Sequence, residues 1–234
     1  MRVLGVVPAR SGSKGLPNKN IMSLNGKPLI EWAVNVGISS PSIDDVYIST
    51  DSKAYEDIAL SAGAKSAGLR SESLSSDTAK TADVVKDLLM KLSESGRNYD
   101  LVVLLQPTSP IRSVSEIENA IEQINTSKEA KSLVSVSKFE EPHPYKLKSI
   151  NANGHLEPFI EGASSEVARQ QLPEVYNLTG AIYIVRVQSL LAEKKFLIEP
   201  TIPFVTDSRV NIDTQEDFDY LSYLITTGKF EEYV

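Results

Sequence analysis

The sequence predicts an α/β protein with an open, mainly parallel sheet that is covered by helices. Apolar runs with the character of strands alternate with amphipathic helical segments along most of the chain, an order typical of parallel sheets. The run 101–105 consists of five consecutive apolar residues, which is typical of a strand buried on both faces. A length of 234 residues, with 41% hydrophobic and 24% charged residues, suits one such domain or one domain with a small insertion.

The first half of the chain provides strands and helices in this alternation. Residues 2–8 form an apolar run that predicts a buried first strand, and residues 46–50 predict a second strand. Helices are expected at 29–37, at about 53–62 and at 81–93, because apolar residues recur there at helical spacing.

The second half continues the pattern after the strand at 101–105. The segment Ser113–Glu116 has the spacing of a capping box and predicts the start of a helix. Further strands are expected at 133–136 and 180–185. A second segment of the same kind, Thr214–Asp217, predicts the start of a final amphipathic helix.

Residues 139–177 interrupt the regular pattern. They are rich in Pro, Asn, Gly, Glu and Lys, and only 146–150 and 155–159 have the character of short strands. The segment is either an inserted β-rich excursion or a long surface loop. A loop of this length within a compact domain is unusual and is often functional.

Composition excludes several classes of protein. The net charge of −7 comes without a basic stripe, so we expect no binding to nucleic acid. No stretch approaches the roughly 18 apolar residues of a membrane span, and we expect no membrane partner. Because cysteine is absent, disulfides, thiolate metal sites and cysteine nucleophiles are excluded, which fits a cytoplasmic protein. The two histidines, His143 and His155, lack metal-ligand spacing.

A small-residue loop with several cations follows the first strand. The run Pro8–Gly15 contains Arg10 and Lys14, and Lys19 follows shortly after. Ligands bind outside the carboxyl ends of strands in open α/β sheets, and glycines let the backbone approach a phosphate closely. The loop matches neither the P-loop motif nor the dinucleotide-binding motif. It predicts a nucleoside-triphosphate site, the alternative being a solvated turn.

Two later segments also contain candidate ligand groups. The run Gln106–Arg112 follows the strand at 101–105, so its polar groups could hold a sugar or a sugar acid at the same edge of the sheet. Its alternative role is a Pro-rich turn. Asp213 follows an alternating run and could lie at a strand end as a Mg²⁺ ligand, or it could simply cap the last helix.

Taken together, these residues resemble the bacterial CMP-sialic acid synthetases, the N-acylneuraminate cytidylyltransferases. The resemblance covers nearly the whole chain in order, and it is most specific in its first and fourth segments. The segments that carry it are Pro8–Gly15 with Lys19 and Asn20, Ser49–Asp51, Ser76–Thr78, Leu105–Pro110, Arg169–Pro173, Gly180–Tyr183 and Ile212–Thr214.

The resemblance implies a Rossmann-like, three-layer nucleotidyltransferase fold. Residues 1–137 and 179–234 would form the α/β domain, and residues 138–178 would form an inserted β-rich dimerisation segment. The resemblance also implies a homodimer in which Lys146 and Arg169 reach the neighbouring subunit's site.

The resemblance further implies the role of each site residue. The nucleotide CTP would be held by Pro8, Ala9, Arg10, Ser11, Ser13, Lys14, Lys19, Asn20, Arg70 and Thr81. The sugar acid would be held by Gln106, Thr108, Ser109, Lys146, Arg169, Gln170, Tyr183, Phe196 and Leu197. The metal, Mg²⁺ or Mn²⁺, would be held by Asp213 and Asn211, and the catalytic residues would be Arg10, Lys14 and Asp213.

Three positions depart from the family pattern. Asn211 stands where the family commonly has an acid, and an amide oxygen is a weaker ligand for a hard cation. Thr179 stands where the family often has Asn, and Asn177 stands where some members have Arg. We expect the last two to lie close to the sugar and to bear on substrate identity.

The implied reaction is transfer of CMP from CTP to the anomeric hydroxyl of a nine-carbon 2-keto sugar acid, with release of pyrophosphate. The acid would be N-acetylneuraminic acid or a close relative, activated for cell-surface polysaccharide synthesis. Legionaminic, pseudaminic and eight-carbon acids are the nearest alternatives. A non-catalytic nucleotide- or sugar-binding module is an alternative of another class. A cytidylyltransferase for sugar 1-phosphates is disfavoured, because only Arg112 is available near Gln106 for a second phosphate.

Overall fold

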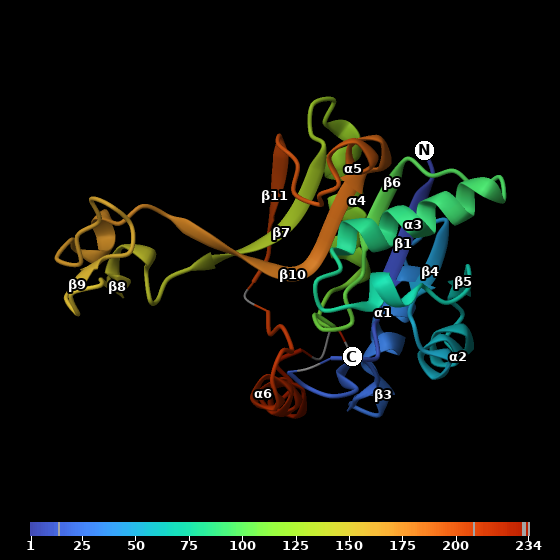
Figure 1. Ribbon diagram of the computed structural model, residues 1–234, viewed down its shortest axis with the longest axis horizontal. Coiled ribbons are helices and arrows are strands. Elements are labelled where there is room, and N and C mark those ends of the chain that lie inside the picture. The colour runs from blue at the N-terminus through green and yellow to red at the C-terminus, as the bar shows by residue number, and fades with distance from the viewer. Residues whose placement is uncertain (14, 208, 231–232, 234) are drawn as a thin grey trace.

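A computed structural model describes residues 1–13, 15–207, 209–230 and 233 (Figure 1). Its centre is a seven-stranded sheet in the order β11-β7-β10-β6-β1-β4-β5. The strands are β1 (Val3–Pro8), β4 (Asp45–Ser49), β5 (Lys65–Ser66), β6 (Leu101–Leu104), β7 (Ser132–Phe139), β10 (Val175–Arg186) and β11 (Thr201–Val205). Strand β10 runs antiparallel to both of its neighbours, and the other neighbouring pairs are parallel. The prediction of a mainly parallel sheet is therefore confirmed.

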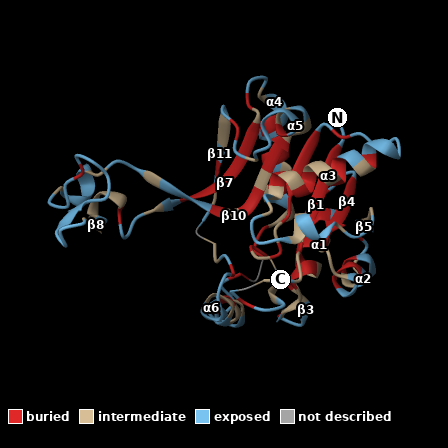
Figure 2. Ribbon diagram, viewed as in Figure 1, coloured by how far each residue is buried: buried red, intermediate tan, exposed pale blue. Residues whose placement is uncertain are grey.

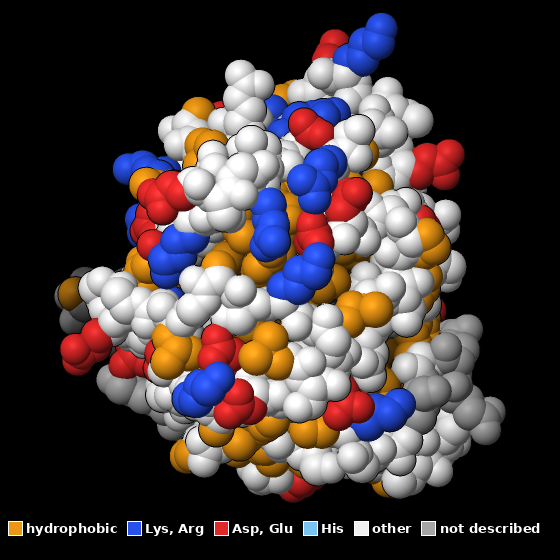
Figure 3. Space-filling view, turned by 90° about the vertical axis from the view of Figure 1, so that its right-hand side faces the viewer, with side chains coloured by type: hydrophobic (Ala, Val, Ile, Leu, Met, Phe, Trp, Pro, Cys, Tyr) orange, Lys and Arg blue, Asp and Glu red, His pale blue; other side chains and the backbone are white. Residues whose placement is uncertain are grey.

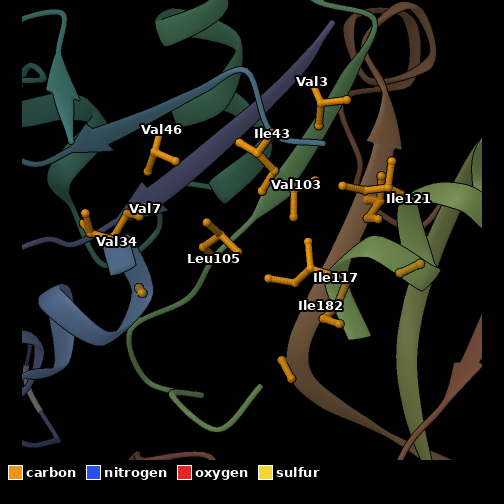
Figure 4. Packing of buried hydrophobic residues seen from close by; sticks show 14 of the residues in the cluster. Val3, Val7, Val34, Ile43, Val46, Val103, Leu105, Ile117, Ile121 and Ile182 are labelled. Carbon is orange, nitrogen blue, oxygen red and sulfur yellow. The ribbon is translucent and has the colours of Figure 1, made fainter. Parts of the chain in front are cut away.

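Helices cover both faces of this sheet. They are α1 (Leu29–Ile38), α2 (Lys53–Ser61), α3 (Thr81–Glu94), α4 (Val114–Thr126) and α5 (Val187–Glu193). The last helix, α6 (Gln215–Thr226), packs at the carboxyl edge of the sheet instead. Alternate residues of β1 point to opposite faces. Val3 and Val7 pack with α1, α2 and α4, whereas Leu4 and Val6 pack with α3 and α5. The first of these two cores is drawn in Figure 4, and the buried strands between the two layers are red in Figure 2. This is the expected three-layer arrangement.

Smaller elements complete the chain. Two hairpins are formed by β2 (Ser23–Leu24) with β3 (Lys27–Pro28), and by β8 (Lys148–Ile150) with β9 (Leu156–Pro158). Four short 3₁₀ helices are η1 (Lys19–Ile21), η2 (Glu72–Ser75), η3 (Pro144–Lys146) and η4 (Arg169–Gln171).

Several elements differ from the sequence-based expectation. Strand β11 was not expected, since Pro203 lies within it; the strand tolerates this residue because it is at the edge of the sheet. Helix α5 is only seven residues long and gives little periodic signal. Strand β10 starts at Val175 rather than at 180, because its first residues lie in a solvent-exposed ribbon where apolar alternation is not required.

A long arm leaves the sheet between β7 and β10 (Figure 1). The outer ends of the two strands pair with each other, with Val175 opposite Phe139 and Tyr176 opposite Lys138. The chain between them carries the small hairpin of β8 and β9, whose residues are largely exposed (Figure 2). The expected limits of the insertion, 138 and 178, fall inside these two continuous strands, and the division into domains stays a proposal.

The carboxyl ends of β1, β4 and β6 lie at one edge of the sheet, since the three strands are parallel neighbours. A third apolar cluster packs at this edge and holds the segments that follow the strands. It joins Leu16 of the first loop with Ile111, Ile212 and Leu221. The loops that carry the candidate site residues therefore rest on a common apolar base.

The outer surface is mixed in charge. On the face shown in Figure 3, acidic side chains lie among the basic ones, so the basic groups form no patch of a single sign. Within the described ranges, no helix has both the length and the apolar composition that crossing a membrane requires.

Candidate functional site

A cavity of about 610 Å³ lies at the carboxyl edge of the sheet, where the loops after β1 and β6 meet. Eleven of the candidate residues line it together: Pro8, Arg10, Ser13, Lys19, Asn20, Arg70, Thr81, Gln106, Thr108, Asn211 and Asp213. Lys14 lies outside the described residues. The first loop, the loop after β6 and the segment before α6 thus contribute to one space, although they are far apart in the sequence.

Arg10 forms the most direct charge contact in the cavity. Its Nη1 lies 2.7 Å from Asp77 Oδ1, and both side chains are about one-third exposed (31% and 38%). Asp77 lies in the connection between η2 and α3, which begins at Thr81. This acid lines the cavity as a partner of Arg10.

Lys19 connects the first loop to the segment before α6. Its Nζ donates to the backbone carbonyl of Ile212 at 3.1 Å and to Asp213 Oδ1 at 3.0 Å. The buried neighbour Asn20 donates from Nδ2 to the carbonyl of Arg10 at 3.0 Å, which fixes the turn of the loop. Both residues line the cavity: Lys19 contributes a positive charge, and Asn20 holds the backbone of the first loop through Arg10.

Asp51, which follows the carboxyl end of the neighbouring strand β4, fixes the first loop. Its carboxylate accepts hydrogen bonds from the backbone N–H of Ser11 at 2.9 Å and from the Ser11 hydroxyl at 3.1 Å. Ser11 therefore faces Asp51, and Ala9 is fully buried in the core with its N–H donated to Ser49 O at 3.0 Å. These two candidate nucleotide ligands shape the loop and do not line the cavity.

Arg70 is the second arginine of the cavity wall. Its Nε donates to Ser75 Oγ at 3.1 Å, which anchors the guanidinium beside η2. Burial lowers the pKa of Arg70, and the nearby carboxylate of Asp51 partly opposes this shift. A cation held in a partly desolvated position is suited to a phosphate group.

A hydrogen bond between Ser109 and Asn211 joins the loop after β6 to the segment before α6. The Ser109 hydroxyl donates to Asn211 Oδ1 at 2.7 Å, and Asn211 Nδ2 donates to Asp213 Oδ2 at 2.7 Å. Gly180 lies against this pair at φ +75°, where an added Cβ would be 2.5 Å from Ser109 Oγ. The segment that contains Gly180 can approach Ser109 this closely only because it has no side chain.

Asp213 differs from both expectations for it. It does not end a strand, and it does not cap α6, because Thr214 is the N-cap and forms a full capping box with Asp217. The Asp213 side chain is 66% exposed and lines the cavity. Its carboxylate is therefore available to a ligand, with only Lys19 and Asn211 as partners in the described chain.

The donor set fits a divalent cation through Asp213 but not through Asn211. An amide must present its N–H₂ group to a carboxylate, so the Asn211 oxygen is directed toward Ser109 and away from Asp213. The described residues contain no group of three His, Cys, Asp or Glu side chains that could hold a metal by themselves. One carboxylate completed by substrate phosphate oxygens is a common way of binding Mg²⁺.

Several candidate sugar-acid residues lie away from this cavity within one chain. Lys146, Arg169 and Gln170 belong to the arm, where Arg169 pairs with Glu140 at 2.6 Å. Tyr183 lies on β10, and its ring packs edge-on against Phe196 with centroids 6.5 Å apart. Burial raises the pKa of the Tyr183 hydroxyl. Leu197, the other apolar candidate, has 44% of its surface exposed.

Two residues expected to bear on the sugar have structural partners instead. The buried Thr179 hydroxyl lies 2.6 Å from Ser135 Oγ, and Asn177 Oδ1 accepts from Ser137 Oγ at 2.7 Å. Arg112 is also buried, with 3% of its surface exposed, and does not line the cavity. The one cation that the sequence offers near Gln106 for a second phosphate is therefore absent from the described lining of the cavity.

Asp51 and Asp77 belong to segments of the family resemblance, but neither was predicted to have a role in the site. Asp51 directly follows a predicted strand at the ligand edge, and that position was a usable signal. Asp77 lies in the irregular connection before α3, where no periodic pattern marks the direction of a side chain.

Comparisons with known proteins agree on one family. The cytidylyltransferase family model matches residues 4–230. The CMP-N,N'-diacetyllegionaminic acid synthase of Legionella pneumophila is 38% identical over 221 residues, which cover 93% of this chain and 94% of that protein. The N-acylneuraminate cytidylyltransferase of Streptococcus agalactiae serotype V is 36% identical over 222 residues, which cover 93% of this chain but 52% of that protein. This chain therefore spans about half the length of the streptococcal relative.

A solved structure shares the fold. It is described as CMP:2-keto-3-deoxy-manno-octonic acid synthetase complexed with CTP. The TM-score is 0.73 at 17% sequence identity, and the match covers 97% of this chain and all of that one (100%).

Proposed function

The chain belongs to the cytidylyltransferase family, and on that premise we propose that it transfers CMP from CTP to a nine-carbon 2-keto sugar acid, releasing pyrophosphate. One observation carries the assignment of the site. Arg10, Lys19 and Arg70 line the same cavity as Gln106, Thr108 and Asp213, so cations suited to a triphosphate face polar groups suited to a sugar acid.

The reaction forms a bond between the anomeric oxygen of the sugar acid and the α-phosphorus of CTP. The bond from that phosphorus to the bridging oxygen breaks, pyrophosphate leaves, and the hydroxyl loses its proton. Such a transfer depends on in-line positioning and on stabilising charge at the phosphate oxygens. In this proposal Arg10 and Lys14 supply positive charge from the first loop. Arg70, which lines the same cavity as Arg10, supplies it from the segment before η2.

A divalent cation, Mg²⁺ or Mn²⁺, completes the proposed site at Asp213. When bound it would neutralise charge on the phosphate groups. Lys19 and Asn211 hold the two oxygens of the Asp213 carboxylate from opposite sides, so the carboxylate is oriented before any ligand arrives. Asn211 acts as a donor to Asp213 and not as a metal ligand.

The sugar acid is assigned to the wall formed by Gln106, Thr108 and Gly180. Gln106 and Thr108 face the cavity, and the Gln106 amide oxygen lies 3.5 Å from where a side chain on Gly180 would begin. Ser109 supports this wall through Asn211. No described residue of this wall has a cationic side chain, which disfavours a sugar 1-phosphate as the acceptor.

The chain is further proposed to act as a homodimer through its arm. Ile150, Leu156 and Phe159 of the arm are 73%, 71% and 67% exposed, an apolar surface that a second copy could cover. Lys146, Arg169 and Gln170 cannot reach the cavity of their own chain if the arm is extended as in Figure 1, and they are assigned to the partner's site.

N-acetylneuraminic acid or a close relative is the proposed acceptor. The similarity to a legionaminic acid synthase along almost its whole length favours N,N'-diacetyllegionaminic acid as a second candidate. Pyrophosphate release from CTP and Mg²⁺ should be measured with N-acetylneuraminic, legionaminic, pseudaminic and eight-carbon acids. We expect the largest kcat/KM for a nine-carbon acid. Absence of turnover with every acid would instead indicate a non-catalytic binding module.

A further inference from the structure

Arg112 is a buried arginine directly behind the sugar-acid wall. Its Nη1 donates to three backbone carbonyls, those of Gln106 at 3.0 Å, Ser109 at 2.9 Å and Ala181 at 3.1 Å. Gln106 and Ser109 belong to the loop after β6, whereas Ala181 belongs to β10 beside Gly180. One guanidinium nitrogen therefore connects the two segments that form the wall.

The sequence explains why this loop needs such a donor. Gln106 and Ser109 each precede a proline, Pro107 and Pro110, and a proline has no backbone N–H. Within the loop the N–H of Ser109 donates to Gln106 O at 3.2 Å, and the two prolines leave few further donors for its carbonyl oxygens. Arg112 donates to the carbonyl oxygens of Gln106 and Ser109, on the side of the loop away from the cavity. The side chains of Gln106 and Thr108 line the cavity.

The charge of Arg112 has no direct counter-ion among the described residues. Its Nε and Nη2 are buried without a hydrogen-bond partner there. The nearest interacting acid, Glu116, is already bonded to Arg209 at 2.7 Å and to the N–H of Ser113 at 2.8 Å. Burial lowers the pKa of Arg112 to about 9, which still leaves it cationic at neutral pH.

An isolated buried cation destabilises a fold unless another group compensates it. For comparison, Arg186 also donates to three carbonyls, those of Ala130, Ile124 and Ser127, but through both Nε and Nη2 and at the far end of β10. A neutral donor would serve the carbonyls behind the wall without the cost of a buried charge. An unpaired positive charge behind the wall would, however, attract an anion bound on its other side.

We propose that Arg112 is a positioning residue for the sugar-acid subsite, which it shapes through three carbonyls and makes favourable for a carboxylate through its unpaired charge. The proposal rests on the proposed function, since that function places the sugar acid against this wall. Arg112 is not a catalytic residue, because its guanidinium is buried behind the loop and does not line the cavity.

The test compares Arg112→Met with Arg186→Met as the matched control. Thermal unfolding is measured for each variant, with kcat and separate KM values for CTP and N-acetylneuraminic acid. For Arg112→Met we expect the KM for the acid to rise about tenfold, the scale of a lost charge-assisted hydrogen bond, with the KM for CTP within about twofold. Arg186→Met should lower the melting temperature and leave both KM values within about twofold.

Two further comparisons separate positioning from charge. Arg112→Lys retains the charge with a single donor group, so we expect a smaller rise in the KM for the acid, about threefold. If Arg112→Met does not fold, the KM of Arg112→Lys for the acid provides the test. The C1 amide of the sugar acid, tested as a competitive inhibitor, should lose less affinity in Arg112→Met than the acid does. An equal loss for acid and amide would contradict the electrostatic part of the proposal.

The proposal is overturned if folded Arg112→Met binds the acid as the natural protein does, or if both KM values rise together. Should the natural protein show no turnover with any acid, the proposed function fails separately. In that case calorimetric binding of N-acetylneuraminic acid to the natural protein and to Arg112→Met still tests Arg112. Unchanged affinity there would also overturn the proposal.

Discussion

The Ser109 hydroxyl donates a hydrogen bond of 2.7 Å to the Oδ1 atom of Asn211, and this contact links the proposed sugar-acid wall to Asp213, the acid of the proposed metal site. Asn211 passes the link on to Asp213 through its Nδ2, and Asp213 accepts in turn from Lys19 of the first loop. A continuous set of hydrogen bonds therefore runs from the proposed acceptor subsite to the proposed nucleotide loop.

This relationship predicts the effect of Asn211→Asp. The change replaces a donor to Asp213 by a second carboxylate, which repels Asp213 in the absence of a cation and offers a second ligand in its presence. We expect the half-saturating Mg²⁺ concentration for pyrophosphate release to fall about 3- to 10-fold. Asn211→Ala, which only removes the donor, should raise it. An unchanged Mg²⁺ requirement in both variants would contradict the role assigned to Asn211.

Gly180→Ala should damage the sugar-acid wall. An added Cβ would be 2.5 Å from Ser109 Oγ at a backbone φ of +75°. Overpacking of this kind costs about 1–3 kcal/mol, and the left-handed backbone costs an alanine about 1 kcal/mol more. Gly154→Ala is the control, because Gly154 has φ +78° with nothing within 4 Å. Urea unfolding should show the larger loss for Gly180→Ala, with a raised KM for the acid in that variant alone.

The regular elements were predictable because their signals are local. Alternating burial along β1 and the capping boxes at Ser113 and Thr214 depend on neighbouring residues, and both capping boxes are confirmed. Strand β11 was hidden by Pro203, and the start of β10 was hidden because its ribbon is exposed. Strand β11 depends on its place at the edge of the sheet, and the start of β10 depends on pairing within the arm. Neither can be recognised from a short stretch of sequence.

The site was predictable to the extent that strand ends define it. The rule that ligands bind at carboxyl ends predicts the loop at Arg10 and the loop at Gln106 at the same edge of the sheet, and the two loops line one cavity there. The partners of these residues were not predictable, because Asp77 approaches Arg10 and Asn211 approaches Ser109 only through the tertiary fold. Resemblance to a family supplied roles for residues but not their hydrogen-bond partners.

Asp45→Asn should reduce stability at the opposite edge of the sheet. Burial alone would raise the pKa of Asp45, but hydrogen bonds from Lys65 and Tyr99 and the charge of Arg2 lower it below its ordinary value of 3.8. The group therefore stabilises the fold above that value, and the contribution is lost as the pH falls through the lowered folded-state pKa. We expect a loss of about 1–3 kcal/mol at pH 7.

The pH dependence of this loss provides the check. The difference in unfolding free energy between the natural protein and Asp45→Asn should be constant from pH 7 down to about pH 5 and should shrink below about pH 4. Chemical denaturation at each pH measures it. A difference that stays constant down to pH 3 would show that the charge of Asp45 does not contribute.

Arm residues should complete the site of a second copy. Leu156→Glu with Phe159→Glu places charges on the exposed apolar surface of the arm, and we expect light scattering to show a monomer in place of a dimer.

A mixing experiment tests directly whether the arm of one subunit completes the site of the other. Arg169→Ala should inactivate through the arm and Arg10→Ala through the cavity, so mixed dimers should regain about a quarter of the natural activity, on random pairing with one intact site per mixed dimer. No recovery after exchange of subunits would exclude a contribution of the arm to the partner's site.

The most direct test of the proposed site is the turnover of Arg10→Ala and Lys14→Ala with saturating CTP, Mg²⁺ and a sugar acid that the natural protein accepts. Arg10 lies in the wall of the cavity beside Asp77, and the first loop is assigned to the triphosphate. Loss of one preorganised charge should reduce kcat by about 10²–10³ in each variant. Near-native kcat in both variants would contradict the assignment of CMP transfer to this loop.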